Sequence, residues 1–282
     1  MVKSREGAVM NRISRDRQTQ IIGCLVEGNS IRSTERMTET HRDTIMRLMI
    51  SAGEVCANLM DERMRNLSCR RIQLDEIWAY VQKKQRHLTP TDDPSRVGDQ
   101  WTFVALDPDT KIIPAFRVGK RDLETATAFL IDLSERLINR IQISSDALRA
   151  YVDATEQAFG SDADYGQIVK IYECEPVGPG RYSPPHVVDA KRSVISGNPD
   201  LRHISTSYVE RQNLTMRMNM RRFTRLTNAF SKKIENLRAA VALHFAHYNF
   251  VRIHKTLRVT PAMEAGITNR LWTISDLLEW AN

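Results

Sequence analysis

The chain is poor in cysteine and lacks any long apolar run. Its four cysteines include no Cys-x-x-Cys pair and none has a histidine at ligand spacing, so neither a disulfide framework nor a zinc ribbon is predicted. No segment approaches the ~18 apolar residues of a membrane span. The N-terminus has no apolar core of a secretory signal. These absences argue against membrane and secreted proteins and predict a protein of the reducing cytoplasm.

The chain does have a strong apolar content and an excess of basic charge. Of its 282 residues 41% are hydrophobic, enough to bury one large domain or two to three smaller ones. Its 41 Lys and Arg outnumber its 34 Asp and Glu, which gives a formal net charge of +7. A basic balance favours a polyanionic partner such as double-stranded DNA, and the position of the charges decides how strong that inference is.

Residues 1–69 predict a helical region. Apolar residues recur at helical spacing over residues 17–27, a short helix follows, and a third helix runs from about residue 40 to residue 64. The third helix opens with polar and basic residues, among them Arg42 and Arg47. Two short helices before a basic one are typical of a helix-turn-helix DNA reader, while an ordinary three-helix bundle fits the pattern equally well.

Residues 70–238 predict an α/β domain. The segments 71–81, 101–106 and 112–118 read as a three-stranded meander, and 123–139, 141–146 and 151–159 read as helix, strand and helix. This is the element order of an RNase H-like domain with a mixed five-stranded sheet. Glycine and proline punctuate 160–206, which predicts a loop-rich insertion with one more strand near 167–172. A long helix is expected from 207 to about 238, followed by a helical tail at 239–282.

Three acids fall where such a domain could hold metal. In an RNase H-like sheet the first and fourth strands are neighbours ~4.8 Å apart, so Asp75 and Asp146 could share a divalent cation. Glu210, early in the long helix, could complete the site. Oxygen ligands favour Mg²⁺ or Mn²⁺, and two ions per site would suit phosphoryl transfer. Glu76 is expected on the opposite face of the strand and outside the site.

The same acids admit structural roles. Asp146 could simply cap the following helix, and Glu210 could be a solvated helix residue. Asp75 is the strongest candidate, because an acid inside an apolar strand is costly to bury without a partner.

The segment after Glu210 is strongly basic. From residue 211 to 238 there are eight Lys or Arg and one acid. On a continuous helix Glu210, Asn213, Arg217 and Arg221 would share one face, where they could place DNA phosphate beside metal. Further candidate DNA contacts in this segment are Arg222, Arg225, Lys232 and Lys233. A second stripe, Val209, Met216, Met220 and Phe223, is the expected core contact.

These motifs resemble the bacterial insertion-sequence DDE transposases of the "insertion sequence one" type. The resemblance lies in Leu74-Asp75-Glu76-Ile77-Trp78-Ala79-Tyr80-Val81, in Ser145-Asp146, and above all in Ser207-Tyr208-Val209-Glu210-Arg211-Gln212-Asn213-Leu214 with Arg217 and 230–233. It extends to Tyr248-Asn249, Arg252, His254, Leu257 and Thr260-Pro261-Ala262 and covers about 70–275. The 63 residues between Asp146 and Glu210 exceed the compact spacing of the best-known members.

The resemblance implies a transposase that cleaves and joins DNA. Asp75, Asp146 and Glu210 would be the catalytic metal ligands, with Mg²⁺ or Mn²⁺ as cofactor, and Arg217 would contact substrate DNA. The N-terminal helices would bind the terminal inverted repeats. Because two ends of the element must be paired, the resemblance implies a homodimer or a larger synaptic assembly. It also implies a location in the bacterial cytoplasm, at the nucleoid. The alternatives are an inactive, transposase-derived DNA-binding regulator and a nuclease of the same fold that cuts without joining.

Overall fold

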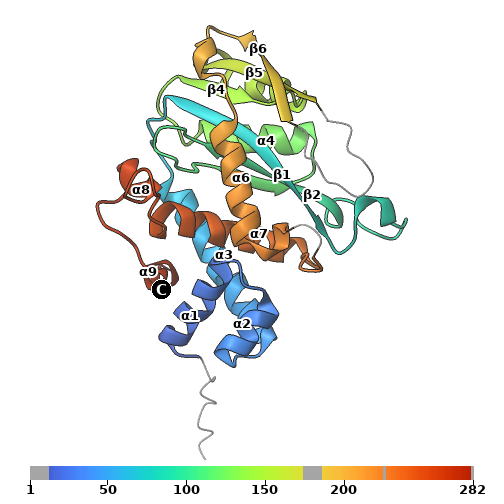
Figure 1. The fold of residues 1–282 in the computed structure, drawn as a ribbon, viewed down its shortest axis with the longest axis vertical. Helices are drawn as coiled ribbons and strands as arrows, with labels where there is room; N and C mark the ends of the chain where they lie inside the picture. Colours follow the sequence, from blue (N-terminus) through green and yellow to red (C-terminus); the bar gives the residue numbers. More distant parts are fainter. Residues whose placement is uncertain (1–12, 174–185, 225–226, 281–282) are drawn as a thin grey trace, which may run out of the picture.

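The computed structural model describes residues 13–173, 186–224 and 227–280. Figure 1 shows the N-terminal helices at one end of the molecule and a twisted sheet at the other, with α6 (Ser207–Asn219) crossing one face of the sheet and α4 (Leu123–Ser134) on the other. None of the helices in the described ranges combines the length and apolarity that crossing a bilayer requires.

The predicted N-terminal helices are present as α1 (Arg15–Val26), α2 (Ile31–Thr38) and α3 (Arg42–Arg63). Side chains cap their first turns: the Ser30 hydroxyl accepts from the Ser33 amide and His41 Nδ1 from the Asp43 amide. Such caps satisfy backbone donors that have no partner within the helix. The apolar stripes of α1 and α3 are fully buried at Ile22 and Ile45, which explains why the helices associate.

Within the described residues six strands form one mixed sheet in the order β3-β2-β1-β4-β5-β6. The strands are β1 (Arg71–Val81), β2 (Gly98–Leu106), β3 (Phe116–Gly119), β4 (Ile141–Ser145), β5 (Ala163–Glu173) and β6 (His186–Ser196). β1 is antiparallel to β2 and parallel to β4, so the first and fourth strands are neighbours at the centre. The predicted α/β, RNase H-like fold class is confirmed.

The predicted insertion at 160–206 contains more strand than expected. β5 begins at Ala163, and β6 adds a sixth, antiparallel edge strand where loop was predicted. The β-branched residues Val187, Val188, Val194 and Ile195 carry strand propensity, but all four are at least 37% exposed. Pairing with β5, rather than burial, therefore holds β6 in the sheet.

The single long helix predicted from 207 to 238 is wrong. α6 ends at Asn219, Met220 is extended at φ −123°, a short 3₁₀ turn covers Arg221–Phe223, and α7 begins only at Ile234. No glycine or proline causes this break. Met220 and Phe223 are 6% and 4% exposed, so burial of these two side chains redirects the backbone. Arg221 consequently does not continue the face of Glu210.

α3 and α7 (Ile234–Ala246) join the N-terminal helices to the rest of the molecule. They cross so closely at Gly53 that a Cβ there would lie 2.2 Å from the Ala239 carbonyl oxygen. Near the end of α3 the buried Arg136 donates to the carbonyl oxygens of Met60 and Met64, at 3.0 and 3.4 Å. One hydrophobic core therefore runs without interruption from the N-terminal helices into the sheet domain.

The C-terminal tail packs on this same core. A π-helical turn at His247–Val251 follows α7, and the helices α8 (Pro261–Glu264) and α9 (Ile274–Glu279) close the chain. Asn249, fully buried, accepts from the Ile113 amide at 3.0 Å and donates to its carbonyl at 2.9 Å. This residue of the tail motif thus holds the segment between β2 and β3.

Candidate active site

Two central strands bring Asp75 and Asp146 together. The β1–β4 ladder ends with the pair Gln73 and Ser144; Asp75 lies two residues further along β1, and Asp146 directly follows the last residue of β4. β1 continues its pairing with β2, in which Asp75 is the register partner of Val104, while β4 ends at Ser145. Asp146 therefore lies beside the middle of β1, at a point where the sheet has opened.

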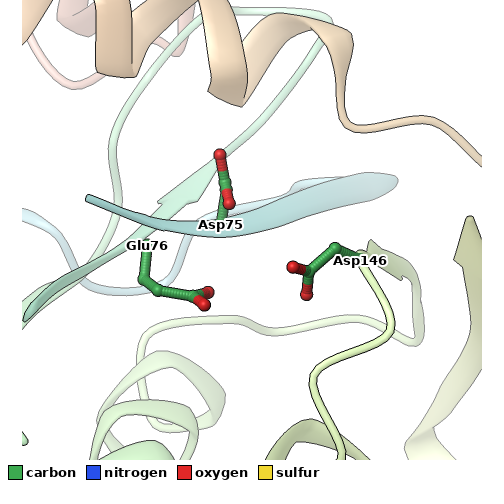
Figure 2. A group of neighbouring side chains, drawn as sticks. All are labelled: Asp75, Glu76 and Asp146. Carbon is green, nitrogen blue, oxygen red and sulfur yellow. The ribbon is translucent and has the colours of Figure 1, made fainter. Parts of the chain in front are cut away.

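The clustered carboxylates are those of Asp75, Glu76 and Asp146, whose ligand atoms lie within 4.8 Å of one another. In Figure 2 Asp75 and Glu76 leave opposite faces of β1, and Asp146 extends from the end of β4 toward the strand. The opposite orientation of Glu76 matches the expectation. The expectation that Glu76 lies outside the site is wrong. Beyond the end of β4 no strand of the described residues lies beside this edge of β1, so the Glu76 and Asp146 carboxylates approach each other there.

Burial and like charge destabilise the ionised acids. The pKa of Asp75 is raised to about 7, first by burial and then by the charges of Glu76, Asp146 and Glu210. Burial and the Asp146 charge also raise the pKa of Glu76. A divalent cation would relieve this repulsion, and hard oxygen donors are the ligands that Mg²⁺ and Mn²⁺ prefer. The residues present fit such a metal.

Glu76 already has a cation partner. Arg121 Nε donates to Glu76 Oε1 at 2.6 Å, and the buried Tyr151 hydroxyl donates to Oε2 at 3.1 Å. The Arg121 guanidinium lies 4.9 Å from the centre of the Trp101 ring and 3.9 Å from Asp146 Oδ2. Arg121 therefore links Glu76 to Asp146 and neutralises part of the cluster.

Glu210 lies over the site but outside the ligand cluster. Its Oε1 accepts from the Thr206 hydroxyl at 2.6 Å and forms an ion pair with Lys170 of β5. Its charge nevertheless contributes to the raised pKa of Asp75. Asp146 does not cap the following helix, the alternative role considered for it: its Oδ1 accepts from the Leu148 amide at 3.0 Å in a turn before α5 (Ala150–Phe159), whose N-cap residue is Arg149.

The predicted DNA contacts fall into separate places. Arg42 and Arg47 are exposed in the first turns of α3, and Lys232 and Lys233 are exposed before α7. Asn213 is not on the surface: it is 7% exposed, and its Nδ2 donates to Asp75 Oδ2 at 2.8 Å.

The remaining predicted contacts divide at the end of α6. Arg217 is half-buried on α6, Arg221 is exposed in the turn beyond it, and Arg222 is half-buried with Nε donating to the Ser231 hydroxyl. Arg225 lies outside the described residues. The basic residues thus continue past the helix without forming the single row expected.

Three polar residues beside the acids were not predicted from the sequence: Arg121, Tyr151 and Lys170. Their partners lie 45, 75 and 40 residues away along the chain. The one available signal was Glu76 itself, because a second acid in an apolar strand needs a cation or a donor. Nothing local singles out Lys170 within β5.

Comparisons with known proteins give a weak likeness. No family profile and no curated sequence matches the chain. Solved structures similar to it include "Mos1 transposase paired-end complex with left transposon end", at 14% identity and a TM-score of 0.21, over 55% of this chain and 60% of that one. "Crystal structure of the Mos1 Strand Transfer Complex" is 17% identical with a TM-score of 0.20, over 55% and 58% of the two chains.

The chain thus spans about 60% of the length of the first of these structures. A likeness at this level carries no weight for function. The proposal that follows rests on the acids and their surroundings.

Proposed function

We propose that the protein is a metal-dependent DDE transposase of an insertion sequence, which cleaves DNA at the element ends and transfers the strand to a target. The observation that carries this proposal is the position of Asp75 within β1 and of Asp146 at the end of the neighbouring β4, with the Glu210 helix across the same site. Acids so placed repel one another when ionised, which is the arrangement a divalent cation stabilises.

Asp75, Asp146 and Glu210 would hold the metal. Two ions of Mg²⁺ or Mn²⁺ would supply an activated attacking oxygen and charge stabilisation of the leaving oxygen. Asn213 orients Asp75 through its 2.8 Å hydrogen bond, and Arg121 holds Glu76 away from α6. Glu210 reaches the cluster by leaving Lys170, a side chain 19% exposed that can then approach phosphate.

The N-terminal helices would recognise the terminal inverted repeats. α2 and α3 follow one another as a short helix and a basic one, and the exposed side chains of Arg42 and Arg47 occupy the first turns of α3. Residues at that position of a helix-turn-helix contact base edges in the major groove. Because two ends must be paired before strand transfer, a homodimer or a larger assembly is part of the proposal.

The test is strand cleavage by the full chain with Mn²⁺ on a plasmid that carries the DNA flanking the gene. Asp75→Asn and Asp146→Asn should each abolish cleavage while DNA binding persists, because an amide keeps the shape and loses the charge. Asp153→Asn, an exposed acid on α5 (Ala150–Phe159), is the matched control and should cleave normally.

The products separate the candidate activities. Joined DNA indicates a transposase, and cut DNA without joining indicates a nuclease. DNA binding by the wild type without cleavage would contradict the enzyme and favour the inactive regulator. Normal cleavage by Asp75→Asn would contradict the assigned site.

A further inference from the structure

A cavity of about 640 Å³, whose lining includes none of the acids, lies between the N-terminal helices and the segment that follows α6. Residues of α1, of the turn that leads into α2, of the start of α2 and of α3 form one wall, and residues 220–222, 227–233 and α7 form the other. Of the two walls, the second lies closer to Glu210. It begins at Met220, which is ten residues after Glu210, a separation of roughly 15 Å at the helical rise. The volume of the cavity is within the range of ligand sites, about 300–1,000 Å³.

His244 of α7 lines this cavity with two unsatisfied nitrogens. The residue is 3% exposed, and neither Nδ1 nor Nε2 has a hydrogen-bond partner in the described part of the chain. Burial, together with the charges of His247 and Arg252, lowers its pKa to about 3, so the ring is neutral at ordinary pH. A neutral imidazole offers one donor and one acceptor, and leaving them unmade costs free energy.

Arg222, which is half-buried, lines the same cavity with a partly desolvated charge. Its Nε donates to the Ser231 hydroxyl at 2.9 Å, and within residues 13–173, 186–224 and 227–280 it makes no ion pair. Burial lowers its pKa to about 10. Partial removal of a guanidinium from water without an anion costs free energy, so a bound anion would stabilise this side chain.

The other walls of the cavity complete its chemistry. Met49, Met220 and Leu243 supply apolar surface, each at most 6% exposed. Arg42 and Lys233 stand at its border and are exposed. A ligand that fits must therefore combine an anionic group for Arg222, a flat apolar body, and a polar edge that pairs with a donor and an acceptor.

We propose that this cavity binds one nucleotide, with its phosphate on Arg222 and its base between the methionines and against His244. A nucleobase has apolar faces and an edge of alternating donors and acceptors, and guanidinium groups bind phosphate in a bidentate manner. The nucleotide is either an unstacked unit of bound DNA or a free one. The first source rests on the proposed function, since Arg42 belongs both to the cavity border and to the α3 turn expected on DNA.

The site predicts opposite effects on stability and binding. His244→Leu removes two unsatisfied polar atoms, so the ligand-free protein should melt at a higher temperature than the wild type. The same variant loses its pairing with the base edge. A histidine retained only for packing would give the reverse result, a lower melting temperature with unchanged ligand binding.

The first arm of the experiment is isothermal titration of the full chain, without divalent metal, with the four deoxynucleoside 5′-monophosphates and with inorganic phosphate. At least one nucleotide should bind ten-fold or more tightly than phosphate. Arg222→Met should weaken that nucleotide at least ten-fold, and His244→Leu should remove the preference over phosphate. Arg211→Met, an exposed arginine of α6 outside the cavity, is the control and should bind as the wild type does.

The second arm identifies the source. Duplexes from the flanking DNA carry 2-aminopurine at successive positions, and its fluorescence rises when the base unstacks. A rise at one position with the wild type but not with His244→Leu assigns the site to bound DNA. Nucleotide binding without any rise assigns it to a free nucleotide.

Three outcomes would overturn the proposal: no nucleotide binds, phosphate binds as tightly as every nucleotide, or both cavity variants bind like the wild type. Because the first arm uses neither metal nor cleavage, a failure of the proposed transposase activity would leave its result intact.

Discussion

Replacing Gly53 by alanine tests the crossing of α3 and α7, because two physical effects predict opposite signs. In a helix interior alanine is favoured over glycine by about 1 kcal/mol, so propensity alone predicts a more stable protein. The added Cβ, however, would lie 2.2 Å from the Ala239 carbonyl oxygen and 2.6 Å from its Cα. These are backbone atoms that cannot rotate away, so the helices must separate at a cost on the order of 3 kcal/mol.

The expected net loss is about 2 kcal/mol. For a chain of 282 residues, an unfolding entropy of about 2.1 cal/mol/K per residue converts this loss to a fall in melting temperature of roughly 3–4 °C. The assay is thermal unfolding followed by circular dichroism.

Gly23→Ala in α1 is the matched control. A Cβ at Gly23 would meet only Ile274 Cδ1, at an ordinary 3.5 Å. Propensity then acts alone, and the melting temperature should rise by roughly 1–2 °C. If Gly53→Ala also raises the melting temperature, the two helices do not cross at Gly53 and the continuity of the core across that point is refuted.

Three further predictions concern α6, the end of α3 and the acids. Met216 is fully buried and Met218 is 64% exposed, so alanine at Met216 should cost about 2–5 kcal/mol in urea unfolding and alanine at Met218 less than about 0.5. Arg136→Met should cost about 3 kcal/mol in the same assay, since it removes the guanidinium that donates to Asp132 and to the carbonyl oxygens of Met60 and Met64, of which Met60 keeps only the Met64 amide as a donor; an unchanged midpoint would contradict that network. Asp75 has its pKa raised from 3.8 to about 7, so its ionisation at higher pH penalises the folded state. Without metal, Asp75→Asn should therefore be more stable than the wild type at pH 8, by at most about 4 kcal/mol, and the gain should shrink toward pH 5; a gain that grows on acidification would reverse the assigned sign.

Local patterns were enough to predict the elements that carry the acids. Strand formers around Asp75 predicted β1, and the order of elements predicted that β1 and β4 are neighbours, which the ladder confirms. The core stripe of α6 was also predicted, because Val209 and Met216 recur at helical spacing and both are fully buried.

The break after α6 and the partners of the acids could not be predicted in this way. No local signal ends the helix at Asn219, since the cause is burial of side chains against distant elements. The pairing of Arg121 with Glu76 depends on how β1 meets the segment before α4, and that of Lys170 with Glu210 on how β5 meets α6. Both are tertiary contacts, and their basic partners, Arg121 and Lys170, carry no distinguishing pattern in their own segments.

The packing of α3 against α7 fixes the distance between the N-terminal helices and the rest of the protein. α3 is one uninterrupted helix of 22 residues, roughly 33 Å long, whose first turns carry Arg42 and Arg47 and whose later turns are locked against α7. An enzyme of the proposed kind then has no hinge within α3 between reading a sequence and cutting beside it. One added base pair moves the target phosphate by about 3.4 Å and turns it by about 35° around the duplex. Substrates with altered spacing should accordingly be cut poorly at every position, rather than cut at a shifted one.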